Sequence, residues 1–150
     1  MTGVQTCALP ISGGVLLILR MLPLQRLAAM LETAAEQGLF VLLEAFDERD
    51  LDVAGELLAA APRREGVLVG INCRDLTSLA VVPERFAELA ARLPPDVPAV
   101  AESGVATPAD AHKVRGLGYR LALVGTALMA RQDAGGLVAE MLAAARTVSR

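Results

Sequence analysis

Polar side chains that could carry acid–base chemistry follow three short apolar runs of the sequence. Glu44 ends the first run, and burial there would raise the pKa of its carboxyl toward neutral pH, as a proton shuttle requires. Asn72 and Arg74 end the second run two positions apart, so in an extended chain both side chains point to the same side. Glu102 and Ser103 end the third run. Together these groups suit a polar or anionic substrate, because Arg offers a planar fork for a carboxylate or phosphate.

Several of these residues also have a purely structural interpretation. Glu44 could form a salt bridge or a cap at a strand end, and Arg74 could pair with a nearby acid and hold its own loop. Cys73 directly precedes Arg74 and should face the opposite way, so we expect it to pack in the core and not to act as a nucleophile. His112 is the only histidine, and it lies in a predicted helix, where we expect it at the surface.

Two glycine turns predict a phosphate site. Gly104 directly follows Ser103, while Gly125 and Thr126 follow another apolar run and precede a short predicted helix. The bare backbone of glycine lets an anion approach closely, and the free N–H groups at a helix start attract it. We therefore expect Gly104, Gly125 and Thr126 to bind a phosphate group.

Short apolar runs alternate with longer amphipathic stretches from Gly13 onward, as is typical of parallel strands joined by crossover helices. Each run has the composition of a strand that is buried on both faces. The predicted strands are Val15–Leu19, Phe40–Glu44, Val67–Ile71, Ala99–Glu102 and Leu121–Val124. The predicted helices are Leu24–Gln37, Glu48–Ala60 with Asp47 as N-cap, Pro83–Arg92, Ala109–Leu117, and a last one from about Asp133 to Thr147.

This pattern indicates an α/β protein, and either an open doubly wound sheet or a closed (β/α)8 TIM barrel could contain it. The polar strand ends favour the barrel, where several strand ends converge on one mouth. An open sheet would need a glycine-rich first turn, and no G-x-G-x-x-G follows a strand here. The sequence therefore predicts a partial barrel of about five βα units. Missing units would leave two open edges, which invite self-association.

Composition narrows the function classes. The net charge is −3, and no basic stripe indicates a nucleic acid partner. No apolar run approaches the roughly 18 residues that a membrane span needs. The two cysteines suggest no disulfide and suit a reducing cytoplasm, and no cluster has the spacing of metal ligands. We expect a cytoplasmic protein that handles a small phosphorylated molecule without a metal.

We interpret the first 12 residues as a translation of reagent DNA and not as natural protein sequence. Residues 3–11, Gly-Val-Gln-Thr-Cys-Ala-Leu-Pro-Ile, are the translation of GGA GTT CAG ACG TGT GCT CTT CCG ATC, which resembles a common sequencing-library adapter. We therefore expect residues 1–12 to be a non-native leader and residues 13–150 to be the C-terminal part of a barrel. A short natural leader is the alternative.

With these motifs together, the chain resembles indole-3-glycerol-phosphate synthase from about Gly13 to Ala145. The resemblance rests on VLLIL, VLLEAFDERDL, GINCRDL, VAESGV, TPAD and LVGTALM in unbroken order. It implies strands 4 to 8 of a ribulose-phosphate-binding barrel, a lyase of tryptophan biosynthesis, and no cofactor. It also implies site roles: Glu44, Asn72 and Glu102 as catalytic residues, Arg74 and Ser103 as substrate ligands, and Gly104, Gly125 and Thr126 as phosphate ligands.

The chain departs from the family pattern in two respects. The family's general-acid lysine, a second substrate-contacting lysine and an early catalytic glutamate come from the first three strands. This chain has no residues that correspond to them, and its one lysine is Lys113 in a helix. Phe46 stands where the family often has a polar residue. We therefore expect the isolated chain to be inactive. The alternatives are a non-catalytic half-barrel that assembles with another chain, and a different phosphate-binding TIM-barrel enzyme.

Overall fold

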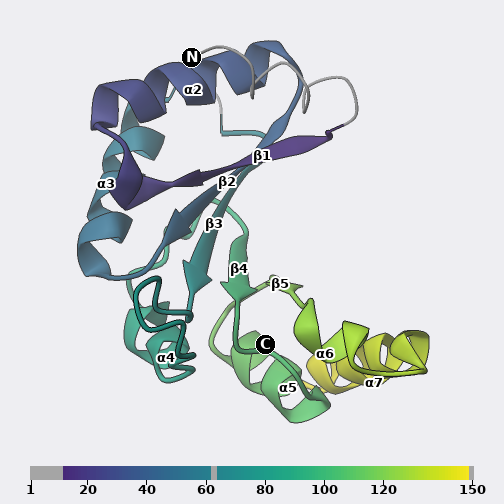
Figure 1. The fold of residues 1–150 in the computed structure, drawn as a ribbon. Coiled ribbons are helices and arrows are strands. Elements are labelled where there is room, and N and C mark those ends of the chain that lie inside the picture. Colours follow the sequence, from purple (N-terminus) through teal and green to yellow (C-terminus); the bar gives the residue numbers. More distant parts are fainter. Residues whose placement is uncertain (1–11, 62–63, 149–150) are drawn as a thin grey trace.

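A computed structural model describes residues 12–61 and 64–148 of the protein. Its five strands form one parallel sheet in which sequence order is also spatial order, β1-β2-β3-β4-β5 (Figure 1). The strands are β1 (Gly14–Ile18), β2 (Phe40–Ala45), β3 (Val67–Asn72), β4 (Ala99–Glu102) and β5 (Leu121–Leu123). All five predicted strands are confirmed, with ends that shift by at most one residue.

The predicted helices are confirmed as well, and a short 3-10 helix joins them. The helices are η1 (Leu19–Met21), α2 (Leu24–Glu36), α3 (Glu48–Ala60), α4 (Arg85–Ala90), α5 (Pro108–Gly116), α6 (Thr126–Met129) and α7 (Ala134–Arg146). The sequence did not indicate η1, and α4 is shorter than predicted because Pro83 and Glu84 form a turn before it. In the part of the chain that the structure describes, no helix has both the length and the apolar character to span a membrane.

Local capping explains where the helices begin. Asp47 is the N-cap of α3, and its side chain accepts a hydrogen bond from the Asp50 N–H at 3.0 Å. Thr107 opens α5 in a capping box in which its hydroxyl and the Asp110 carboxylate each satisfy a backbone N–H of the other residue. The predicted cap at Asp47 is therefore confirmed.

The core lies between the sheet and the helices. Partners in parallel strands point to the same side, so the residues that pack under the helices recur at every second position. Leu43, Val69 and Ala101 are fully buried members of this helix-facing layer, and Tyr119 and Phe86 pack edge to face at 5.3 Å against it. Figure 1 shows α2 and α3 beside β1–β3, while α5, α6 and α7 gather beside β4 and β5.

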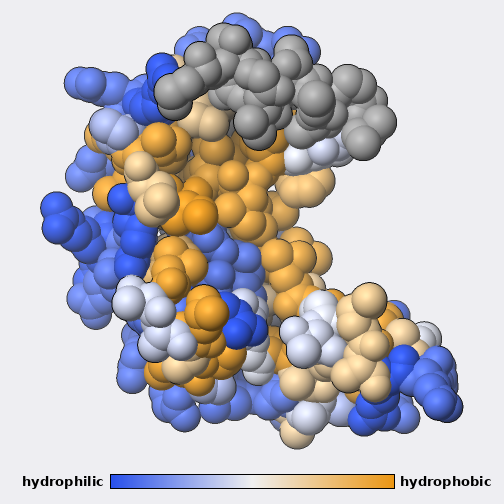
Figure 2. Space-filling view, viewed as in Figure 1, coloured by the Kyte–Doolittle hydropathy of each residue, from blue (hydrophilic) through white to orange (hydrophobic). Residues whose placement is uncertain are grey.

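The opposite face of the sheet is partly open, which corrects one expectation. The sequence predicted strands buried on both faces, but Leu16 in β1 is 45% exposed, and Leu121 and Leu123 in β5 are 48% and 49% exposed. The reason is that β1 and β5 are the edges of the described sheet and each pairs with one neighbour. Figure 2 shows the molecule hollowed on one side, with a largely hydrophobic surface there.

Candidate active site

The three predicted catalytic residues meet at the carboxyl ends of the central strands. Glu44 pairs in register with Gly70, and Asn72 pairs with Glu102, so these side chains share the open face of the sheet. The Asn72 Nδ2 donates a hydrogen bond to Glu44 Oε1 at 2.7 Å. Glu44 is 5% exposed and Glu102 is 3% exposed. The geometry thus brings two buried carboxyls and one amide together.

One carboxyl oxygen of Glu102, Oε1, has no hydrogen-bond donor among the described residues, although the carboxyl itself lies within hydrogen-bond reach of Glu44. That oxygen lies directly over Gly70, where a Cβ would overlap it. Burial, reinforced by the neighbouring Glu44 carboxylate, raises the pKa of Glu102 to about 8. Glu102 is therefore mostly protonated at neutral pH.

The two carboxyls have the environments of an acid and a base. Glu102 holds a proton that it can release, while Glu44 accepts a hydrogen bond from Asn72. Two neighbouring carboxyls that share one proton are a recurring arrangement for proton transfer near neutral pH. The structure shows a raised pKa at the strand-end acid Glu102, and the proton-shuttle role expected of Glu44 stays a prediction.

Replacing Gly70 by Ala is expected to push the Glu102 carboxyl out of its buried place. The added Cβ overlaps Oε1 and comes within 2.9 Å of the carboxyl carbon and 3.0 Å of Leu42 Cδ1, so the side chain must move toward water. We expect the pKa of Glu102 to fall by about one unit or more. A carbon-detected NMR titration of the Glu102 carboxyl measures this fall in pKa. Gly55→Ala is the matched control, because Gly55 lies in α3 with nothing within 4 Å of its Cβ position.

Arg74 lies beside this cluster and is held by its own loop. Its backbone N–H donates to Asn72 Oδ1 at 2.8 Å, and its Nη1 donates to the Leu79 carbonyl at 3.0 Å. The residue also forms an antiparallel bridge with Val81. A loop contact of this kind was one of the two interpretations of Arg74, although the acceptor is a carbonyl and not an acid. The guanidinium carries five N–H donors, so this contact leaves donors for a substrate anion.

The predicted phosphate residues lie at the ends of two paired strands, β4 and β5. Ser103 has a φ of 56°, a left-handed backbone that turns the chain sharply after β4. Among the described residues, no acceptor takes a hydrogen bond from the backbone N–H of Ser103, Gly104 or Gly125. A Cβ on Gly104 would lie 3.0 Å from the Phe86 ring, whereas a Cβ on Gly125 would have no atom within 4 Å. Gly104 is thus needed for packing, and Gly125 and Thr126 are exposed.

Two further predictions concern residues away from the cluster. Cys73 is fully buried in the helix-facing core, as expected, and burial raises the pKa of its thiol to about 12. His112 is exposed, as expected, and its Nδ1 lies 3.2 Å from the Ala144 carbonyl of α7. Most of the predicted leader, residues 1–11, lies outside the described residues, so that interpretation stays a prediction.

Sequence reasoning missed two arginines near the cluster. Arg85 donates from Nη1 to the backbone carbonyl of Asn72 at 2.6 Å, and Arg20 binds the buried carboxylate of Asp50. Arg85 stands 13 positions from Asn72, and Arg20 stands 30 positions from Asp50. A charged residue in the first turn of α4 or after β1 carries no local signal of such a contact.

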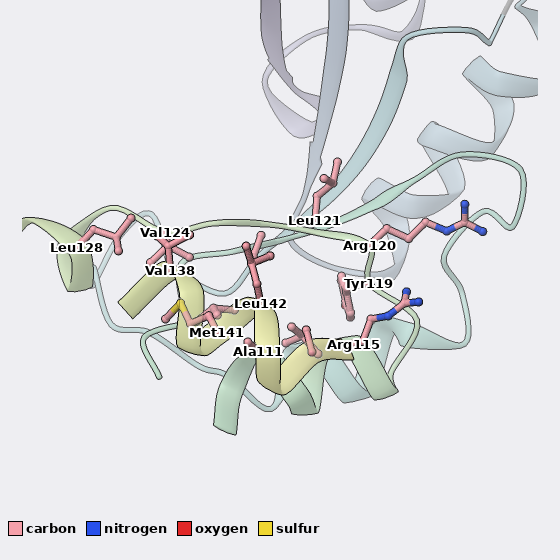
Figure 3. A pocket seen from close by; sticks show the side chains of 14 residues that line it. Ala111, Arg115, Tyr119, Arg120, Leu121, Val124, Leu128, Val138, Met141 and Leu142 are labelled. Carbon is pink, nitrogen blue, oxygen red and sulfur yellow. The ribbon is translucent and has the colours of Figure 1, made fainter. Parts of the chain in front are cut away.

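A cavity of about 340 Å³ lies elsewhere, between α5, β5 and α7. Its lining is mostly apolar and includes Tyr119, Leu121 and Met141, and none of the described residues that line it is acidic. Figure 3 shows the guanidinium groups of Arg115 and Arg120 pointing away from it to one side. The polar cluster at the strand ends, and not this cavity, is therefore the candidate active site.

Comparison with solved structures supports the fold. A thiamine phosphate pyrophosphorylase from Pyrococcus furiosus superposes with a TM-score of 0.66 at 19% sequence identity, over 93% of this chain and 62% of that one. Identity at this level shows the fold alone. The five parallel strands with their crossover helices are thus part of a (β/α)8 barrel, as the sequence predicted.

Comparison of sequences gives the family. An indole-3-glycerol phosphate synthase from Chlorobium luteolum is 37% identical over 84% of this chain and 45% of its own length. One from Halobacterium salinarum is 41% identical over 79% of this chain and 44% of its own length. The chain thus spans about half the length of these relatives. The family model of indole-3-glycerol phosphate synthase matches residues 4–141, and the chain belongs to that family.

Proposed function

We propose that this chain carries strands 4 to 8 of an indole-3-glycerol-phosphate synthase, a lyase of tryptophan biosynthesis. The whole enzyme converts 1-(2-carboxyphenylamino)-1-deoxyribulose 5-phosphate to indole-3-glycerol phosphate with loss of carbon dioxide and water. The observation that carries the proposal is the cluster of Glu44, Asn72 and Glu102, in which one buried carboxyl holds a proton near pH 7 and the other is hydrogen-bonded. Family membership over residues 4–141 supports it.

The chemistry needs an acid and a base close together. In ring closure, the aromatic carbon that bears the carboxylate bonds to the ketone carbon, and the ketone oxygen takes up a proton. Carbon dioxide then leaves, the new hydroxyl departs as water after a second protonation, and a proton is lost from the neighbouring methylene carbon. The family's general-acid lysine, which lies in the first three units, supplies the proton to the ketone oxygen. Glu102, protonated at neutral pH, supplies the second proton, to the departing hydroxyl. Glu44, oriented by Asn72, accepts the methylene proton.

The remaining site residues bind the substrate's charged ends. Arg74 has guanidinium N–H groups beyond its loop contact, and these pair with the anthranilate carboxylate. Ser103 lines the mouth next to Glu102. The backbone N–H groups of Gly104 and Gly125, which no described acceptor uses, bind the phosphate together with Thr126. No step in this scheme uses a metal ion or an organic cofactor.

The purified 150-residue chain is expected to form no indole-3-glycerol phosphate by itself, and to form it when mixed with a protein that carries the first three βα units of a related synthase. The reason is that the family's site lysines lie in those units. Product is measured by its indole fluorescence after separation, and light scattering reports whether the two proteins associate.

The controls separate the alternatives. Each protein alone gives the background, and the mass of the chain alone shows whether its open sheet edges drive self-association. Turnover by the chain alone contradicts the assignment of the first proton transfer to the lysine of the first three units. A stable mixed complex without turnover contradicts the proposed function and favours a half-barrel with no catalytic role.

A further inference from the structure

Asp50 is a buried carboxylate that the proposed chemistry does not use. It lies in the first turn of α3 and is 4% exposed. Its Oδ2 accepts hydrogen bonds from the Phe46 N–H at 2.8 Å and from Nε and Nη2 of Arg20 at 2.9 and 2.6 Å. Three donors, two of them charged, offset the cost of burying this carboxylate. Asp50 therefore holds two separate segments of the chain at one point.

Those two segments are the ends of β1 and β2. Arg20 lies in η1, directly after β1, and Phe46 is the first residue after β2. The Arg20 guanidinium also lies 4.6 Å from the centroid of the Phe46 ring, which is a cation–π contact. Both the backbone and the ring of Phe46 are thus held in place, two residues beyond Glu44.

Helix capping does not account for Asp50. Asp47 already caps α3 by accepting the Asp50 N–H. Another acid of the same helix, Asp52, pairs with Arg92 on the surface, where the two side chains are 60% and 43% exposed, and exposed pairs of this kind contribute little. What distinguishes Asp50 is that its contacts reach the end of β2.

We propose that the ion pair between Arg20 and Asp50 positions Glu44, by fixing the end of β2 so that Glu44 stays in contact with Asn72 and beside Glu102. Arg20 and Asp50 are positioning residues, because they act through the end of β2. Their effect on catalysis rests on the proposed function, but their effect on the geometry of the cluster does not. A displacement of the strand end by about 1 Å is enough to break the 2.7 Å contact between Asn72 and Glu44, and such a displacement can cost about 100-fold in rate.

The test measures the cluster directly in the 150-residue chain by NMR. We compare wild type with Asp50→Asn, Arg20→Met and Arg20→Lys, and read hydrogen exchange of the Asn72 side-chain amide and the titration of the Glu102 carboxyl. In Asp50→Asn and Arg20→Met we expect exchange about tenfold faster and a Glu102 midpoint about one unit lower, because Glu44 moves away. Arg20→Lys keeps the charge and is expected to restore part of both values.

Asp52→Asn is the matched control. Asp52 lies in the same helix as Asp50, and the change breaks its exposed pair with Arg92, so it should change neither the amide exchange nor the Glu102 midpoint. Unchanged exchange and an unchanged midpoint in folded Asp50→Asn and Arg20→Met overturn the proposal. If Asp50→Asn does not fold, the two Arg20 variants test the proposal. The Arg20 side chain is 38% exposed, so replacing it disturbs the core less than replacing buried Asp50. Neither readout needs turnover, so a failure of the proposed function leaves this result standing. In an active mixture with the first three units, we expect Asp50→Asn and Arg20→Met to lower kcat by about 10- to 100-fold with little change in KM. That result would extend the positioning role to catalysis.

Discussion

Replacing Glu102 by Gln is expected to lower kcat of the assembled synthase by about 10²- to 10⁴-fold at pH 7. Gln has nearly the same shape as a protonated Glu, so it fits the buried place over Gly70 and the fold is preserved. It cannot release a proton to the departing hydroxyl. The measurement is steady-state formation of indole-3-glycerol phosphate by the mixture of this chain with the first three units of a relative, with KM determined in parallel.

Glu140→Gln is the matched control for this variant. It makes the same substitution on the exposed surface of α7 and should leave kcat unchanged. A Glu102→Gln mixture that retains kcat within twofold of wild type shows that Glu102 is not the acid. Glu44→Gln in the same mixture then tests whether the other carboxyl performs both proton transfers.

Much of this site could be predicted from the sequence because its signals are local. An apolar run that ends in Glu44, or in Asn72, marks a strand end without reference to the rest of the chain. The carboxyl ends of parallel strands share one edge of a sheet, so polar residues at those ends must meet. Caps such as Asp47 likewise mark helix starts by short-range hydrogen bonds.

The parts that could not be predicted depend on contacts between elements. The place of the Glu102 carboxyl over Gly70 follows from the register of β3 and β4, and a glycine inside an apolar run only weakly indicates such an approach. The pair of Arg20 and Asp50 joins residues 30 positions apart. The exposure of Leu121 depends on which strands lie beside β5, which composition does not reveal.

The same buried carboxyl makes folding stability depend on pH in a direction that can be stated in advance. The pKa of Glu102 is raised from the ordinary value of 4.5 to about 8 in the folded protein, so between these values the folded state binds more protons than the unfolded state. By linkage, the free energy of unfolding then falls as pH rises. The contribution of Glu102 is fully present below about pH 4.5 and is lost by about pH 8, and its loss amounts to a few kcal/mol in order of magnitude.

Urea unfolding of the 150-residue chain at pH 5.5 and pH 8.5 measures this loss. Glu102→Gln carries no ionisable group there, so it should be more stable than wild type at pH 8.5 and should lose little stability between the two values. Two other carboxyls with shifted pKa values, Asp75 and Asp110, do not obscure the result, because their pKa values are lowered from 3.8 and so lie below this window. Equal pH dependence in wild type and Glu102→Gln contradicts a protonated Glu102. A smaller dependence in the variant shows that the folded chain holds this proton by itself, before substrate is bound.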